Sequence, residues 1–148
     1  MTLIAVDPGV HMSGVAMFDN GKLTRAAWWQ SEMVAFDSAH SSELYIEVPR
    51  IYPGNHSKVD LNDLLDLSLA AGWMIGRSDH LKHTRIYPAD WKRQVPKLQM
   101  VERIKGFLTP DELKRVEVPS AKSKQHNVWD AVGIGLFAVG RMKPGGAR

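Results

Sequence analysis

The chain has 148 residues, of which 44% are hydrophobic and 24% charged, and it contains no cysteine. This composition is typical of a globular protein with one domain and a real core, and the length excludes two ordinary domains. The lack of cysteine excludes disulfides and thiolate metal sites. No apolar run approaches the roughly 20 residues of a membrane span, so we expect neither a spanning segment nor export. The net charge of +3 favours a polyanionic partner.

The first third of the chain predicts an antiparallel meander followed by a separate strand. Short apolar segments bounded by turn residues predict strands at 2–7, 14–18 and 22–30. The sequence Asp19-Asn20-Gly21 between the last two is typical of a tight hairpin. The segment ELYIEV, residues 43–48, predicts a fourth strand that Pro49 ends.

The middle of the chain predicts a long helix at 59–77 and a fifth strand at 84–87. The apolar positions of the helix extend beyond a single stripe, and a helix that is apolar on two sides usually has two partners. One partner would be the sheet. The other would be a second subunit, which predicts a homodimer through 59–77. The alternative is a monomer whose helix is covered by residues 98–116.

The last third of the chain is predicted to be helical, with helices at 98–108, from residue 110 and at 126–142. Strands in the first half and helices around them predict a mixed five-stranded α/β sheet flanked by helices. We expect one domain at 1–143 and a flexible tail at 144–148.

Three acids lie in unusually apolar surroundings. Asp7 follows Leu-Ile-Ala-Val, Glu47 lies inside Leu-Tyr-Ile-Glu-Val-Pro, and Asp130 lies inside Val-Trp-Asp-Ala-Val. A buried carboxylate must be paired, protonated or bound to a metal, and carboxylates are the ligands that Mg²⁺ and Mn²⁺ prefer. Each acid also has an ordinary explanation. Asp7 would cap a turn, Glu47 would lie on the exposed face of an edge strand, and Asp130 would pair with a cation.

The predicted last helix offers further polar groups close to Asp130. His126 and Asn127 lie four and three residues before Asp130, so both can share its side of the helix as a metal ligand or a substrate contact. His126 could instead be held by a local hydrogen bond. Gly133 and Gly135 each cost about 1 kcal/mol relative to alanine inside a helix. Close approach of this helix to the sheet would explain them, and it would bring Asp130 near Asp7.

The segments IAVDPGVHMSGVAMF, YIEVP and HNVWDAVGIGL, in this order, resemble the RuvC-type Holliday-junction resolvases of the RNase H-like superfamily. The small chain without cysteine is similar to the phage-type members. This resemblance implies an RNase H-like fold, a homodimer, and a nuclease that makes paired, symmetric nicks in four-way DNA junctions. It also implies a cytoplasmic location, in a bacterium or a phage-infected host.

The resemblance also implies a site that holds two Mg²⁺ or Mn²⁺ ions. Asp7, Glu47 and Asp130 match the three acids of the family, and Asp7 is the candidate to bridge both ions. The family usually has an acid or a histidine three residues before the last aspartate. Here that position is Asn127, with His126 one residue earlier, so the fourth ligand is either of the two. The implied reaction is in-line hydrolysis of a phosphodiester between two ions, with a 5′ phosphate on the product.

Basic and polar loop residues are the candidates for DNA binding, because phosphate contacts require charge more than shape. The loop after Glu47 and the segment before Asp130 are joined covalently to the proposed site. Tyr52 and Trp91 are candidates to stack on bases, with ordinary packing as the alternative for Trp91. The predicted DNA-binding residues are Arg50, Tyr52, Asn55, His56, Lys58, Lys92, Arg93, Lys122 and Lys124.

Two other functions are compatible with the same residues. One is an RNase H-like nuclease that acts on flaps or RNA–DNA hybrids, which would use the same three acids. The other is a junction-binding module with weakened catalysis. The reason to consider it is that Asn127 occupies the position of the usual metal ligand.

Overall fold

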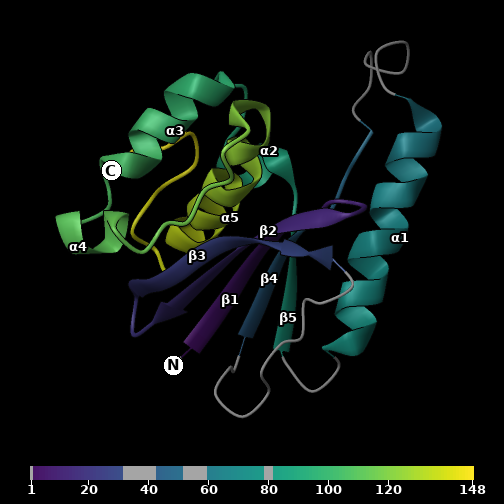
Figure 1. The fold of residues 1–148 in the computed structure, drawn as a ribbon, viewed down its shortest axis with the longest axis horizontal. Coiled ribbons are helices and arrows are strands. Elements are labelled where there is room, and N and C mark those ends of the chain that lie inside the picture. The colour runs from purple at the N-terminus through teal and green to yellow at the C-terminus, as the bar shows by residue number, and fades with distance from the viewer. Residues whose placement is uncertain (1, 32–42, 52–59, 79–81) are drawn as a thin grey trace.

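A computed structural model describes residues 2–31, 43–51, 60–78 and 82–148, which form one mixed sheet with helices on both faces (Figure 1). The strands lie in the order β3-β2-β1-β4-β5. The first three are antiparallel, whereas β4 runs parallel to β1 and β5 runs parallel to β4. The predicted five-stranded α/β sheet is therefore confirmed. The strand bounds are β1 (Thr2–Asp7), β2 (Met12–Asp19), β3 (Lys22–Gln30), β4 (Glu43–Glu47) and β5 (Lys82–Ile86).

The predicted hairpin joins β2 to β3. Asn20 and Gly21 both have positive φ, at 47° and 77°, which a two-residue hairpin turn with the twist of its strands requires. Strand β1 is buried from Leu3 to Val6 because it lies in the middle of the sheet and both of its faces are covered. These local patterns place Asp7 at the end of a central, fully covered strand.

One face of the sheet is covered by all the helices except α1 (Figure 1). The central helix α5 contributes nine consecutive buried residues from Val128 to Leu136, and it packs on β1 and β2. Among the described residues, no helix is both long enough and apolar enough to cross a membrane. The helices are α1 (Leu61–Arg77), α2 (Pro88–Trp91), α3 (Lys97–Lys105), α4 (Pro110–Leu113) and α5 (Gln125–Ala138), with a 3₁₀ turn η3 (Lys122–Lys124) before α5.

Helix α5 is shorter than the predicted 126–142. It ends at Ala138, and Gly140 follows with a φ of 74°, a left-handed conformation that terminates helices. Gly133 and Gly135 lie inside the helix. A Cβ on Gly135 would lie 2.0 Å from the ring of Phe18 on β2, so close approach to the sheet explains this glycine as predicted.

Helix α1 packs alone on the other face of the sheet. Its N-cap Asp60 accepts a hydrogen bond from the backbone of Asn62, and its buried residues Ala71 and Met74 contact the apolar side chains of β1, β2 and β4. The alternative in which residues 98–116 cover α1 is wrong, because α3 and α4 lie across the sheet from it (Figure 1). The outward side of α1 exposes Leu61, Leu65, Leu69 and Trp73.

The segment at 144–148, predicted to be a flexible tail, folds back on the helical layer. The backbone N–H of Gly145 donates to the carbonyl of Trp91 at 2.6 Å, and the guanidinium of Arg103 donates to the carbonyl of Gly145. Lys143 and Ala147 pair as an isolated bridge. These contacts attach the segment to α2 and α3. From sequence alone the Gly-Gly pair in this segment suggests mobility, because contacts with distant residues leave no local pattern in the sequence.

Candidate active site

Asp7 is positioned by a close contact between the sheet and the first turn of α5. In the antiparallel pairing of β1 and β2, Asp7 lies opposite Gly14. A Cβ on Gly14 would lie 1.9 Å from the backbone oxygen of Asn127, so only glycine lets α5 approach β2 this closely. The beginning of α5 therefore lies directly beside the end of β1.

Glu47 ends β4, the parallel neighbour of β1, so both carboxylates emerge from the same edge of the sheet. The indole Nε1 of Trp91 donates a hydrogen bond to Oε2 of Glu47 at 2.7 Å. Trp91 is fully buried, and its ring fills the space that Gly133 leaves open on α5. The packing alternative for Trp91 is thus confirmed, and its ring is unavailable for stacking on bases. Its indole N–H instead holds the Glu47 carboxylate in place.

Asp130 lies one turn into α5 and is only 6% exposed. Its Oδ2 accepts a hydrogen bond from Nζ of Lys92 at 2.8 Å, in an ion pair that is largely shielded from water. The cation pairing considered for Asp130 is therefore present. Lys92, predicted to bind DNA, lies among the acids instead of on an open surface.

The three carboxylates form one electrostatic cluster. Burial raises the pKa of Asp7 well above its usual range, and the charges of Glu47 and Asp130 raise it further. Burial also raises the pKa of Glu47, against the opposing effects of Lys92 and of the hydrogen bond from Trp91. Burial alone would lower the pKa of Lys92, but the Glu47 and Asp130 carboxylates together raise it. The three acids are thus near enough to affect one another's pKa; their convergence on a metal ion stays a prediction.

His126 and Asn127 lie on the first turn of α5, at the border of this cluster. Burial lowers the pKa of His126, and the neighbouring Lys97 lowers it further. A hydrogen bond to the backbone of Ser123 also holds it, which is the local bond considered from sequence. Asn127 contributes its backbone carbonyl to the contact with Gly14. The choice between the two residues as a fourth ligand stays a prediction.

The donor chemistry of the cluster fits a hard divalent cation, since Asp7, Glu47 and Asp130 offer carboxylate oxygens in a desolvated site. In the described ranges, no three histidine, aspartate or glutamate side chains converge closely enough to hold an ion as they stand. The Lys92 ammonium neutralises Asp130 instead. An ion at this place would therefore compete with the Lys92 ammonium for the Asp130 carboxylate.

The remaining predicted DNA-binding residues lie around this edge or outside the described residues. Arg50 is exposed, with its guanidinium over the ring of Tyr87 at 4.9 Å. Arg93 is exposed and adopts a positive φ of 53° in the turn after α2. Lys122 and Lys124 are exposed in η3. Tyr52, Asn55, His56 and Lys58 belong to the ranges that the structure does not describe.

Sequence reasoning missed the roles of two adjacent residues, Trp91 and Lys92. They bind different acids, Glu47 and Asp130, because the short helix α2 places them between β4 and α5. The available signal was that each buried carboxylate needs a donor, and that Trp91-Lys92 is an adjacent pair of strong donors in the stretch PADWK. Only the tertiary packing of α2 shows which donor meets which acid.

Comparisons with known proteins identify a fold. No family model matches the sequence, and no curated protein matches it. Among solved structures, the chain is similar to Thermus thermophilus RuvC in complex with a Holliday junction substrate, with 15% identity, a TM-score of 0.59, and coverage of 97% of this chain and 99% of that one. A second Thermus thermophilus RuvC structure matches with the same identity and coverage and a TM-score of 0.47, which is too low to support an argument. The first likeness shows that the chain has an RNase H-like fold, and it does not address the phage-type subfamily.

Proposed function

We propose that this chain is a structure-selective endodeoxyribonuclease that resolves four-way DNA junctions by paired, symmetric nicks with Mg²⁺ or Mn²⁺. The observation that supports the proposal is that Asp7, Glu47 and Asp130, three acids from β1, β4 and α5, lie near enough for their charges to affect one another's pKa. A further support is the fold's likeness to a RuvC structure solved with a Holliday junction substrate.

The chain's own residues would divide the work at the site. Asp7, Glu47 and Asp130 would hold the ions, with His126 or Asn127 assisting. The ions, when bound, supply Lewis acidity and an activated water. Trp91 keeps the Glu47 carboxylate oriented through its 2.7 Å hydrogen bond. Lys92 neutralises Asp130, and its ammonium would be available to contact a phosphate oxygen of the substrate.

We also propose that the active form is a homodimer through α1. Leu61, Leu65, Leu69 and Trp73 are spaced four residues apart along one side of this helix and are 57%, 62%, 72% and 43% exposed. An apolar stripe of this kind favours a self-complementary two-fold contact. A four-way junction has two symmetric cleavage points, and two linked sites match them.

Arg50, Arg93, Lys122 and Lys124 are proposed to contact phosphates of the junction, together with the loop residues Tyr52, Asn55, His56 and Lys58. Their charge suits contacts with phosphates, and the chain as a whole carries a net charge of +3. A phage-type subfamily and a cytoplasmic location remain parts of the proposal that rest on sequence alone.

The test is nicking of a labelled synthetic four-way junction in Mg²⁺ or Mn²⁺, with linear duplex, flap and RNA–DNA hybrid in parallel. We expect paired symmetric nicks with 5′ phosphates on the junction alone, and none with Asp7→Asn. Predominant cleavage of flap or hybrid would keep the acid cluster as the site but replace the substrate.

A junction-binding module with weakened catalysis is the second candidate, and the Lys92–Asp130 ion pair favours it. An ammonium that neutralises a metal-ligating acid competes with the ion. Tight junction binding with no nicking in either metal, by a protein that also fails to bind Mn²⁺ in a calorimetric titration, would select this candidate.

A further inference from the structure

The segment after α5 forms a tight turn at residues 143–147, which we call the Gly-Gly turn. The backbone N–H of Lys143 donates to the carbonyl of Ala147 at 2.9 Å, and the N–H of Gly146 donates to the carbonyl of Lys143 at 3.1 Å. Gly145 and Gly146 have φ angles of 77° and 72°, in the left-handed region that favours glycine. The turn therefore requires two consecutive glycines, and the function proposed above gives it no role.

The Gly-Gly turn packs between α3 and the residues that follow α2 (Figure 1). A Cβ on Gly145 would lie 3.7 Å from Cδ of Arg93 and 3.9 Å from Cγ2 of Val95. On the other side, a Cβ on Gly146 would lie 2.8 Å from Cδ of Arg103 on α3, whose guanidinium also donates to the carbonyl of Gly145. The turn thus connects α3 with the segment that carries α2.

A hydrogen bond to α2 brings the turn into contact with the residue that binds Glu47. The backbone N–H of buried Gly145 donates to the carbonyl of Trp91 at 2.6 Å. Trp91 is the last residue of α2, where a helix leaves its carbonyls without partners of its own. A helix of four residues is also too short to be stable by its internal hydrogen bonds. The backbone of Trp91 therefore depends on contacts from elsewhere in the chain, and Gly145 supplies one of them.

The side chain of Trp91 carries this position to a proposed metal ligand. Its ring is fully buried against Gly133 of α5, so it cannot rotate freely to compensate for a shift of its own backbone. Its indole N–H donates to Oε2 of Glu47 at 2.7 Å. Hydrogen bonds thus run in series from Arg103 to Gly145, from Gly145 to Trp91, and from Trp91 to Glu47.

We propose that the Gly-Gly turn is a positioning element of the site, which holds the backbone of Trp91 so that its indole N–H keeps the Glu47 carboxylate in place. The effect on the reaction rests on the proposed nuclease function. The connection from the turn to Glu47 does not, because it can be measured without DNA or metal.

The test variant carries Gly145→Ala and Gly146→Ala, which strain the turn at both left-handed positions. The matched control is Gly140→Ala, which places a Cβ at a similar φ of 74° where nothing lies within 4 Å. Both variants carry the same kind of backbone strain, and only the first alters the turn. If the double variant does not fold, Gly145→Ala alone replaces it, since its Cβ would meet only ordinary contacts at 3.7 and 3.9 Å.

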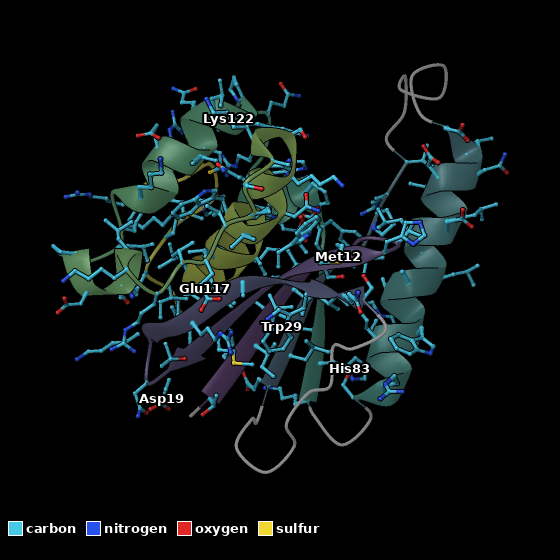
Figure 2. All side chains as sticks on the ribbon, viewed as in Figure 1. Met12, Asp19, Trp29, His83, Glu117 and Lys122 are labelled. Carbon is cyan, nitrogen blue, oxygen red and sulfur yellow. The ribbon has the colours of Figure 1, made fainter. Side chains whose placement is uncertain are left out.

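The first experiment records the indole N–H signals of the five tryptophans by NMR, together with the rates at which these protons exchange with solvent. Trp91→Phe assigns the signal of Trp91. Trp29, which Figure 2 labels on β3, packs on the α1 face of the sheet and provides an internal reference for global unfolding. We expect the double variant to shift the Trp91 signal and to speed its exchange about tenfold or more, with Trp29 unchanged and the Gly140→Ala spectrum unaltered. An unchanged Trp91 signal, or an equal change in the control, would overturn the proposal.

The second experiment measures Mn²⁺ binding by calorimetry and the Mn²⁺ dependence of junction nicking for the same proteins. We expect the double variant to bind Mn²⁺ about tenfold more weakly and to need correspondingly more of it for nicking, while its affinity for the junction without metal stays unchanged. A turn that only stabilised the fold would lower the active fraction without changing the Mn²⁺ dependence, and that result would overturn the proposal. If the unaltered protein neither binds nor nicks branched DNA, the proposed function fails, and the first experiment still decides whether the turn positions Glu47.

Discussion

Glu112 of α4 is the best place for a quantitative test of the fold that supports the site. Both of its carboxylate oxygens accept hydrogen bonds from the guanidinium of Arg141, at 2.6 and 3.0 Å. The same oxygens also accept the backbone N–H groups of Leu23, at 2.8 Å, and Thr109, at 2.9 Å. One side chain therefore ties the start of β3 and the segment after α5 to α4. The perturbation is Glu112→Gln.

The expected loss follows from the pKa of this group. The hydrogen bonds from Arg141, against the effect of burial, lower the pKa of Glu112 from 4.5 to about 2. A carboxyl group with that difference between unfolded and folded chains stabilises the folded state by about 3 kcal/mol at neutral pH. Because the folded pKa is the lower one, this stabilisation is present above pH 4.5 and is lost as the pH falls towards 2. At pH 3 about 1 kcal/mol remains.

The assay is urea unfolding, followed by circular dichroism, of the unaltered protein and Glu112→Gln at pH 7 and pH 3. The control is Asp111→Asn, which removes a neighbouring acid whose only ion pair in the described residues is with exposed Lys114. We expect the difference in unfolding free energy from Glu112→Gln to be about 3 kcal/mol at pH 7 and to shrink at pH 3, with almost none from the control. An equal loss in the two variants, or a loss that does not shrink in acid, would refute the reasoning.

Further changes test the site and the interface. Asp7→Asn should abolish nicking and yet raise the melting temperature in chelator, because it removes a buried charge that its neighbours repel; a lower melting temperature would contradict the electrostatic account. Lys92→Gln should lower the unfolding free energy by about 3 kcal/mol without metal, and added Mn²⁺ should restore more stability than it gives the unaltered protein. An equal response to Mn²⁺ would show that Lys92 does not compete with the ion. Gly14→Ala should lower the unfolding free energy measured in urea by about 2 kcal/mol, since the new methyl group meets the backbone of α5. Nicking should fall in proportion to the loss of folded protein. Unchanged stability would exclude that contact. Leu65→Asp should change the sedimentation of a dimer to that of a monomer while thermal stability stays nearly unchanged, because this side chain is 62% exposed; a dimer that persists would place the interface elsewhere.

The features that could be predicted from sequence are those that depend on neighbouring residues. The bounds of β1 and β3, the Asn20-Gly21 turn and the long helix α1 follow from apolar periodicity and turn chemistry, and the structure confirms them. The electrostatic interaction among Asp7, Glu47 and Asp130 agrees with the sequence argument that a carboxylate inside an apolar run has few stable environments, whereas their role as metal ligands stays a prediction.

The features that could not be predicted depend on contacts between distant segments. The four-residue helix α2 carries too short a pattern to be recognised, and with it the partners that Trp91 and Lys92 find on β4 and α5 were missed. The segment at 144–148 was expected to be mobile. Its contacts to Trp91 and Arg103 come from tertiary packing, which leaves no local signal in the sequence. The end of α5 was placed too late because the apolar pattern continues beyond Gly140 into Met142, which is buried outside the helix.

The central position of α5 has a consequence for the order of events during synthesis. This helix covers β1 and β2 with nine consecutive buried residues, and it also carries Asp130. A nascent chain that has been synthesised only as far as its last strand has one uncovered face of the sheet. It contains Asp7 and Glu47 but not Asp130. Asp130 can join the other two acids only when α5 docks on the sheet, and the Arg141–Glu112 ion pair beyond the end of α5 helps to hold it there. Synthesis as far as the last strand therefore leaves the acid cluster incomplete, and the cluster is completed by the same helix that covers the core.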